Sequence, residues 1–322
     1  MVQEKKSLLY IYQLETSSRK QTGVFACVSV QDYDNDVILK HELTRPDKED
    51  DRTRHILTQS AHAEPVMLTF KDTADVTFLM EKVMMTSSPE IEFQAEDGVW
   101  HRIWKVEAPA DMVEAFSSIP KLYVADGHHR CKSASRTAEE LRKEDGTPPG
   151  EAEYDYFPAV LFPINEMQIL PYNRILKKVT EDQFETLLST LSLSKGASPT
   201  PDKKGHISVF YRGDWYGAPL PAPEGEDAVS KLDVARLQNQ VLSPLFGIEN
   251  PRTDANIDFV GGIRGTEELE RLVNEGIADL AISMYPTAIE ELIDVSDEGQ
   301  LMPPKSTWFE PKIRSGLIIH TF

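Results

Sequence analysis

The run Asp126–Arg130, which reads Asp-Gly-His-His-Arg, gathers the side chains most able to do chemistry in this chain. It follows a short apolar segment, Lys121–Asp126, and precedes Lys132–Lys143, which is full of good helix formers. This order predicts a strand, a glycine turn and a helix in immediate succession. Because unpaired N–H groups and the positive end of the dipole meet at a helix N-terminus, we expect a phosphate or nucleotide to bind there.

Each residue of this run has a candidate role. Gly127 would let the backbone approach the ligand closely, and Arg130 would clamp a phosphate through two parallel hydrogen bonds. His128 and His129 would donate hydrogen bonds to the same group. Asp126 would act as a general base, or would bind a metal ion carried in with the nucleotide.

Simpler interpretations of the run stay open. Asp126 could merely cap the following helix, while the histidines and Arg130 bridge surface groups. Adjacent histidines also suggest zinc, but neighbours on a turn usually point apart and no nearby ligands complete a site, so we expect no protein metal site. The two cysteines, Cys27 and Cys131, lack the paired spacing of a metal or redox motif, and we expect both to be buried.

A second cluster of charged residues lies between residues 41 and 52. Glu42 is a candidate catalytic carboxylate, and the basic side chains around it could screen a polyphosphate. Charge runs are usually solvated faces, so most of the cluster is expected to be ion-paired surface. For ligand binding we single out His41 and Arg52. The cluster comprises His41, Glu42, Arg45, Lys48, Glu49 and Arg52.

Two further segments are predicted to be loops. Asp258–Gly265 is rich in glycine but lacks the Lys-Ser/Thr of a P-loop, so we expect its glycines to serve packing or a turn. Met302–Lys312 is too rich in proline for the interior of a helix or a central strand. We expect this second loop either to close over an anionic substrate, with Lys305 as a phosphate ligand, or to tie down the C-terminus.

Apolar periodicity and turn residues predict a mixed α/β class. Strands are expected at Leu8–Leu14 and Thr22–Val30, as a hairpin, at Glu64–Phe70, Val99–Val106 and Phe157–Phe162, and as a second hairpin over 206–216. Helices are expected after Pro46, near Ala108–Ser118, and at Glu181–Thr190, Asp233–Leu242 and Thr266–Glu275. A polar stretch near residues 195–205 looks like a passage between units. We therefore predict one domain over residues 1–190 and a second mixed α/β unit over residues 191–322.

The size and charge of the chain narrow its function. Its 322 residues favour two domains, because single cores rarely grow beyond about 250–300 residues. Its formal net charge of −19 argues against a nucleic-acid partner, so any anion site must be local. No apolar run approaches the roughly 20 residues that cross a bilayer, and the N-terminus lacks the apolar region of a signal peptide. We therefore expect a cytoplasmic protein with no membrane partner.

Four segments together resemble a known family. They are Gln21–Val30, Lys40–Arg52, Tyr123–Arg130 and Met302–Phe309. Over nearly its whole length the chain resembles a widespread bacterial domain-of-unknown-function family related to free-serine kinases of the SerK type. This resemblance implies kinship with the ParB/sulfiredoxin superfamily, and hence a ParB/sulfiredoxin-like phosphate-binding domain whose turn ends in Arg at the start of a helix. In the serine kinases the turn reads Asp-Gly-His-Thr-Arg, so His129 replaces a threonine.

The resemblance implies a small-molecule kinase that transfers phosphate from ATP or ADP to the hydroxyl of free serine or a related metabolite, with Mg²⁺ neutralising the donor phosphates. It implies that Asp126 and a distant Glu assist removal of the hydroxyl proton, and we take Glu42 for that Glu. The expected partners are the nucleotide and the small-molecule substrate, and we allow for a homodimer.

Other functions could descend from the same turn. Members of the family carry a further N-terminal segment before the position of Leu8, which we expect this sequence to lack. A non-catalytic nucleotide- or phosphometabolite-binding regulatory protein is therefore the alternative, because it needs the anion site but no base. Sulfiredoxin chemistry would need a cysteine inside the turn, and ParB-like DNA binding would need a helix-turn-helix and a basic surface. Neither is evident.

Overall fold

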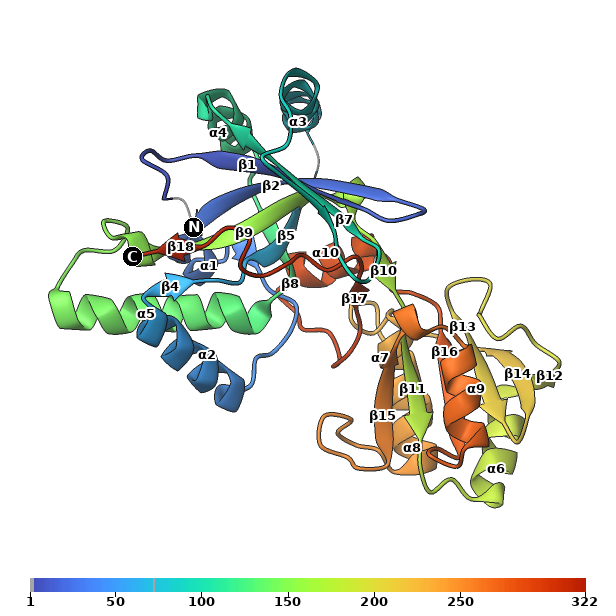
Figure 1. Ribbon diagram of the computed structural model, residues 1–322. Coiled ribbons are helices and arrows are strands. Elements are labelled where there is room, and N and C mark those ends of the chain that lie inside the picture. Colours follow the sequence, from blue (N-terminus) through green and yellow to red (C-terminus); the bar gives the residue numbers. More distant parts are fainter. Residues whose placement is uncertain (1–2, 72) are drawn as a thin grey trace. The chain divides into compact units, whose positions relative to one another are not determined.

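The computed structural model describes residues 3–71 and 73–322, and its contacts divide the chain into two units. Unit 1 comprises Met1–Met167 and Pro311–Phe322, and unit 2 comprises Gln168–Glu310. Both units mix helices and strands, which confirms the expected α/β class (Figure 1). We expected the boundary near residue 190. The contacts place it after Met167, and they return the C-terminal segment to unit 1.

Unit 1 is built on a mixed sheet with the strand order β3-β8-β5-β9-β2-β1-β7-β6. Strands β3 and β8, and strands β5 and β9, run parallel, and the other neighbours are antiparallel. The strands are β1 (Leu9–Glu15), β2 (Lys20–Ser29), β3 (Ile38–Leu39), β5 (Val66–Phe70), β6 (Ile91–Gln94), β7 (Trp100–Val106), β8 (Leu122–Asp126) and β9 (Tyr156–Pro163). A separate short pair joins β4 (Ala61–His62) to β18 (His320–Thr321).

Helices cover one face of this sheet (Figure 1). Side chains of α3, α4 and α5 share a hydrophobic core with Ile11 of β1, Val24 of β2 and Leu68 of β5, which the strand register places on the same face, and α2 packs against α5. The helices are α1 (Val30–Asp34), α2 (Pro46–Gln59), α3 (Ala74–Thr86), α4 (Ala110–Ser117) and α5 (His128–Asp145), with 3₁₀ turns at Glu153–Asp155 and Ile164–Glu166. The central strands are buried on both faces, as β5 shows with five buried residues in succession.

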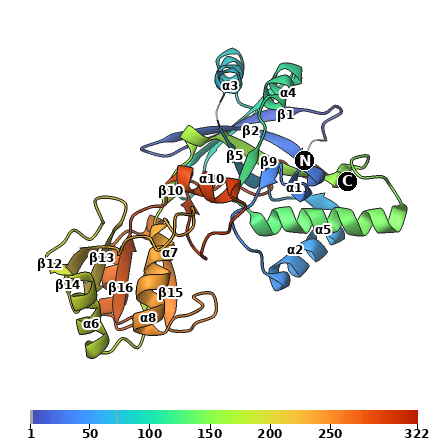
Figure 2. The ribbon, with the colours of Figure 1, turned by 180° about the vertical axis from the view of Figure 1, so that it is seen from behind.

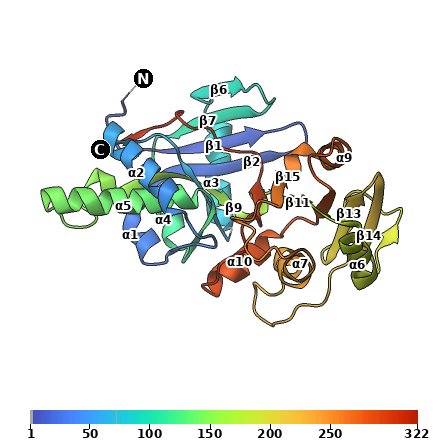
Figure 3. The same ribbon diagram turned by 90° about the horizontal axis from the view of Figure 1, so that it is seen from below.

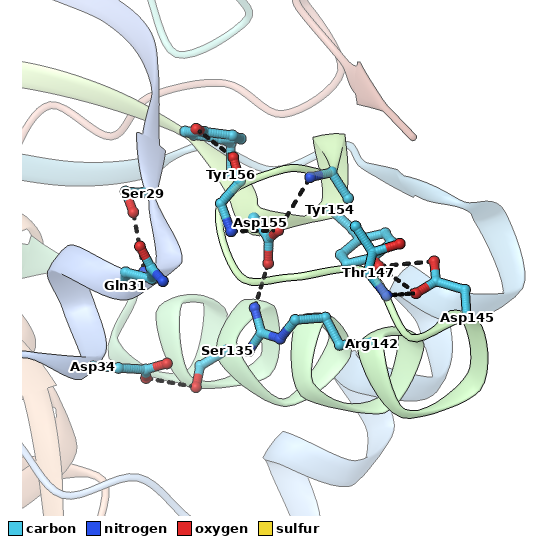
Figure 4. A network of polar contacts seen from close by, with 12 residues as sticks. Ser29, Gln31, Asp34, Ser135, Arg142, Asp145, Thr147, Tyr154, Asp155 and Tyr156 are labelled. Carbon is cyan, nitrogen blue, oxygen red and sulfur yellow. Dashed lines mark hydrogen bonds and ion pairs between the residues drawn. The ribbon is translucent and has the colours of Figure 1, made fainter.

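A polar network fixes the far end of α5, the helix that carries the predicted phosphate-binding turn at its start (Figure 4). The buried carboxylate of Asp155 pairs with Arg142 of α5. It also accepts hydrogen bonds from the backbone N–H groups of Gly150 at 2.8 Å and Ala152 at 3.2 Å. One carboxylate therefore anchors the loop that follows α5 to the helix itself.

Unit 2 has its own sheet, with the order β12-β14-β13-β16-β11-β15 and antiparallel neighbours throughout. Helix α9 lies on one face of it, and α6, α7 and α8 lie on the other (Figures 2 and 3). The strands of this sheet are β11 (Tyr172–Leu176), β12 (Ser194–Lys195), β13 (His206–Tyr211), β14 (Asp214–Pro219), β15 (Ile257–Gly261) and β16 (Leu280–Met284). A separate pair joins β10 (Ile169–Leu170) to β17 (Trp308–Phe309). Its helices are α6 (Glu181–Leu191), α7 (Asp233–Leu237), a π-helix (Gln238–Leu242), α8 (Ser243–Phe246), α9 (Glu267–Asn274) and α10 (Ile289–Asp297), with a 3₁₀ turn at Gly262–Arg264.

Most of the expected elements are present, with three corrections. Helix α5 begins at His128, directly after the glycine, and not at Lys132. The first half of Asp258–Gly265 is the end of strand β15 rather than a loop, because it pairs with β11. Cys27 is exposed, whereas Cys131 is buried as expected. In the part of the chain that the structure describes, no helix is both long and apolar enough to cross a bilayer.

Candidate functional site

The turn between β8 and α5 requires a glycine. Gly127 has φ of +111° and ψ of 27°, a left-handed conformation that L side chains rarely adopt. A Cβ atom at this position would also lie 2.9 Å from Nε of Arg130. Strand, glycine turn and helix therefore follow one another as the sequence predicted, and the glycine leaves room for the guanidinium.

Asp126, the last residue of β8, is held between two cations. Its Oδ2 lies 2.5 Å from Nη2 of Arg130, and its Oδ1 lies 3.0 Å from Nζ of Lys312. Burial raises the pKa of Asp126, but Lys312 and Arg130 outweigh this effect and hold the pKa below its ordinary value. The carboxylate is ionised at neutral pH. It makes no cap to α5, so the capping interpretation is wrong.

Arg130 is oriented by protein groups on two sides. Besides Asp126, its guanidinium donates through Nη1 to the carbonyl oxygen of Pro65, just before β5. Its side chain is about four-fifths buried and contributes to the wall of a neighbouring cavity. A guanidinium that is fixed in this way is pre-organised to meet an anion.

His128, at the start of α5, faces Glu42. Its Nε2 accepts the backbone N–H of His41 at 3.4 Å, so the ring proton resides on Nδ1, which lies 3.6 Å from Oε2 of Glu42. Burial, with smaller contributions from His129 and Arg130, lowers the pKa of His128 to about 3. His128 is therefore a neutral imidazole whose N–H faces a carboxylate.

The other two predicted histidines also lie at this turn. The ring of His41 is buried, and it lies edge-on to His128 with 4.4 Å between the ring centroids. Neither ring nitrogen of His41 has a hydrogen-bond partner among the residues that the structure describes. His129 accepts the backbone N–H of Arg45 through Nε2 at 3.1 Å. Burial, and after it the charge of Arg52, lowers the pKa of His129. The histidines thus join the chain before α2 to the first turn of α5.

A cavity of about 330 Å³ opens between α2, strands β4, β5 and β9, and Arg130. This volume lies at the lower end of the range of small-molecule sites. Apolar residues such as Ile56, Val66 and Phe157 line part of its wall. The cations Lys48, Arg52 and Arg130 line another part, with Asp51, His55, His62 and Glu64 among the remaining polar groups.

The cavity brings together residues that the sequence analysis assigned to separate clusters. It brings Arg52 together with Arg130, although they belong to different predicted clusters. Asp126, His128, His129, His41 and Glu42 do not line the cavity, and they form the adjoining turn instead. Sequence reasoning missed His55, His62 and Glu64, which lack any local motif and meet only because α2 folds back against β4.

Lys305 lies in unit 2. Its ammonium group lies over the ring of Tyr172, 5.3 Å from the ring centroid.

Among residues 3–71 and 73–322, no group of three or more His, Cys, Asp or Glu side chains is arranged to hold a metal ion. Burial raises the pKa of the Cys131 thiol to about 12, so this cysteine is protonated and unreactive.

The family model described as "Protein of unknown function (DUF1015)" matches residues 1–235. The chain belongs to this family. No curated protein matches the sequence.

Solved structures of several distant proteins can be aligned with at least 90% of this chain. A mutant free serine kinase in complex with ADP shares 13% identity and a TM-score of 0.44, covering 93% of this chain and 94% of that one. SbnI with a C-terminal truncation, from Staphylococcus aureus, shares 14% identity and a TM-score of 0.45, covering 92% and 87%. A conserved hypothetical protein from Pyrococcus furiosus shares 12% identity and a TM-score of 0.40, covering 90% and 93%. Similarity at this level assigns neither a substrate nor an activity to this member of the DUF1015 family.

Proposed function

We propose that the protein is a small-molecule kinase that transfers phosphate from ATP or ADP to the hydroxyl of free serine or a related metabolite. The observation that carries this proposal is the cationic cavity. In a chain with a net charge of −19, Lys48, Arg52 and Arg130 converge on one hollow of about 330 Å³. Three cations face two carboxylates in this cavity, and Arg52 pairs with one of them, Glu64, at 3.0 Å. A concave, partly apolar site with more cations than carboxylates suits a nucleotide, whose phosphates need cations and whose base needs an apolar wall.

The cations of the cavity would bind the donor phosphates. Arg130 would supply a planar, bidentate contact, and Lys48 and Arg52 would neutralise the remaining charge. Mg²⁺, which prefers carboxylate and phosphate oxygens, would enter with the nucleotide, and Asp51 and Glu64 are the carboxylates of the cavity wall that could meet it. We further propose that unit 1 is a phosphate-binding domain of the ParB/sulfiredoxin type, which the turn at Gly127 supports.

Glu42 is the proposed general base. It would take the proton of the serine hydroxyl as the oxygen attacks the terminal phosphorus of the nucleotide. The bond from that phosphorus to its bridging oxygen would break, and the electron pair would leave with the shortened nucleotide. His128 would orient Glu42 through its Nδ1 proton. Asp126 would act as a positioning residue, because both its oxygens already contact cations.

The alternative is a regulatory protein that binds a nucleotide or phosphometabolite without turnover. One observation favours it: Asp126, the carboxylate that the resemblance assigns to catalysis, has a lowered pKa and pairs with Arg130 and Lys312. A carboxylate held in this way is a weak base near neutral pH. The same binding site would then serve recognition alone.

Phosphorus NMR of the protein with Mg²⁺, ATP or ADP, and L-serine tests the two functions. The kinase predicts an O-phosphoserine signal that falls roughly 10²–10⁴-fold in Glu42→Gln, because the base is lost. Arg52→Gln should weaken nucleotide binding at least tenfold. The control is Lys143→Gln near the end of α5, because the exposed ammonium of Lys143 pairs with Glu139 and neither residue lines the cavity.

Each outcome selects one function. Product that depends on Glu42 establishes the kinase. Nucleotide binding that depends on Arg52 but not on Lys143, without any product, establishes the regulatory function. If neither nucleotide binding nor product is observed, the cavity is not a nucleotide site.

A further inference from the structure

Arg174 is an unusual arginine of unit 2. It lies in the middle of β11, and only 4% of it is exposed. Its Nη1 donates to the carbonyl oxygen of Tyr172, and its Nη2 donates to that of Lys305 at 3.1 Å. A guanidinium carries five N–H donors, so these two hydrogen bonds do not exhaust its capacity. Burial lowers the pKa of Arg174 to about 10, and the group remains charged at neutral pH.

The charge of Arg174 has no counter-ion in the described part of the chain. No carboxylate among those residues forms an ion pair with it. Three arginines that are less buried than Arg174 pair with a carboxylate. They are Arg130 with Asp126, Arg142 with Asp155, and Arg236 with Asp233. A buried cation without an anion is costly, and a bound anion would remove that cost.

Aromatic rings and a second cation surround this guanidinium. Its Cζ lies 5.4 Å from the ring centroid of Phe259, and the Lys305 ammonium lies 5.3 Å from that of Tyr172. Tyr172 meets Trp308 edge-on, with 5.2 Å between the ring centroids. The three aromatic residues are partly exposed and Lys305 is exposed, so the outer side of this cluster is open to solvent.

The backbone around the cluster is built to hold it. Lys305 has φ of +58°, a left-handed conformation that non-glycine residues rarely adopt and that is often retained at functional sites. The hydroxyl of Ser306 donates to the carbonyl oxygen of Pro303 at 2.6 Å, and Thr287 donates to that of Ser306 at 2.9 Å. A Cβ atom on Gly261 would lie 2.5 Å from the ring of Trp308. That glycine therefore serves close packing, as the sequence predicted.

We propose that Arg174 and Lys305 form an oxyanion-binding site in unit 2, which takes the phosphate or carboxylate group of a small metabolite. Arg174 would contribute the planar hydrogen-bond donor and Lys305 a mobile point charge. The apolar part of the metabolite would pack against Tyr172, Phe259 and Trp308. This site does not depend on the kinase proposal, because it concerns binding alone.

Nitrogen–proton NMR of the full chain, titrated with inorganic phosphate and separately with acetate, tests the proposal. The indole signal of Trp308, assigned with Trp308→Phe, should shift in a saturable way with at least one of the two anions. A saturable shift with phosphate indicates a phosphate site, and a saturable shift with acetate indicates a carboxylate site. Lys305→Gln should weaken binding about tenfold, and Arg174→Met should abolish the saturable shift.

Two control variants show whether the shift arises from anion binding at Arg174 and Lys305. Lys195→Gln removes an exposed lysine of β12, paired with Asp214, and should leave the Trp308 shift unchanged. Arg52→Gln alters the cavity of unit 1 and should also leave it unchanged. A structural role, in which Arg174 only ties the Lys305 loop to β11, predicts no saturable shift in the wild type. That result, or a shift that survives both Lys305→Gln and Arg174→Met, would overturn the proposal.

Discussion

At the scale of single residues, the site combines an ionised carboxylate with neutral histidines, and the surroundings of each group decide its protonation. Asp126 stays charged because two cations hold it, whereas His41 and His128 stay neutral because they are buried. The sequence identified all three residues, since they flank a glycine turn or stand in a charged cluster. It could not assign their protonation, because Lys312, the partner of Asp126, comes from a distant part of the chain and the burial of the two histidines depends on the fold.

The lowered pKa of His62 predicts how the free energy of unfolding depends on pH. It is buried in the cavity wall, its ring stacks on His320, and burial followed by the charge of His320 lowers its pKa to about 4. The unfolded chain takes up the proton near pH 6.5, so below this pH the unfolded state binds more protons and the free energy of unfolding falls. His62→Gln should therefore remove about 2 kcal/mol of the loss in stability between pH 7 and pH 5.

Urea unfolding of unit 1 at several pH values measures this difference. His55→Gln is the matched control, because His55 also lines the cavity but is exposed on α2. It should leave the pH dependence as in the wild type. If His62→Gln loses as much stability as the wild type on acidification, the prediction that His62 is neutral in the folded protein is wrong.

At the scale of elements, the β8–turn–α5 unit was the part of the fold most readily predicted. Gly127 breaks an apolar strand before a run of helix formers, and these signals are local. Strand β16 received no prediction, because its five residues are all buried and such an apolar run shows no alternation. The cavity was equally invisible in the sequence, since its walls come from α2, β4, β5 and β9.

Gly127→Ala tests how this turn serves binding. The new Cβ would strain a left-handed residue by about 1–2 kcal/mol and would displace the guanidinium of Arg130. Gly98→Ala is the control, because Gly98 has φ of +83° but nothing within 4 Å of an added Cβ. Gly98→Ala should lower the melting temperature only through the strained backbone, and Gly127→Ala should lower it further because it also disturbs the contacts of Arg130. Only Gly127→Ala should lose nucleotide affinity, at least tenfold by calorimetry, and equal affinities would show that the turn is purely structural.

At the scale of the whole molecule, the chain leaves unit 1 at Met167 and returns to it at Pro311. The returning segment makes several contacts with unit 1. Lys312 pairs with Asp126, the N–H of Gly316 donates to the carbonyl oxygen of Ala63 at 2.8 Å, and β18 pairs with β4. The length of the chain indicated two units, but a boundary drawn from local polarity could not reveal that the last residues belong to the first unit.

Ending the chain after Glu310 tests this arrangement. Strand β4 supplies Ala61 and His62 to the cavity wall, and the truncation removes its pairing partner. Hydrogen exchange should show at least tenfold faster exchange in β4, together with weaker nucleotide binding, while β13 and β16 of unit 2 keep their protection. Full-length Lys312→Gln separates the lost ion pair from the lost strand, and it should leave β4 protected. Equal loss of protection in both units would mean that they unfold as one, because the segment would then stabilise the whole chain rather than unit 1.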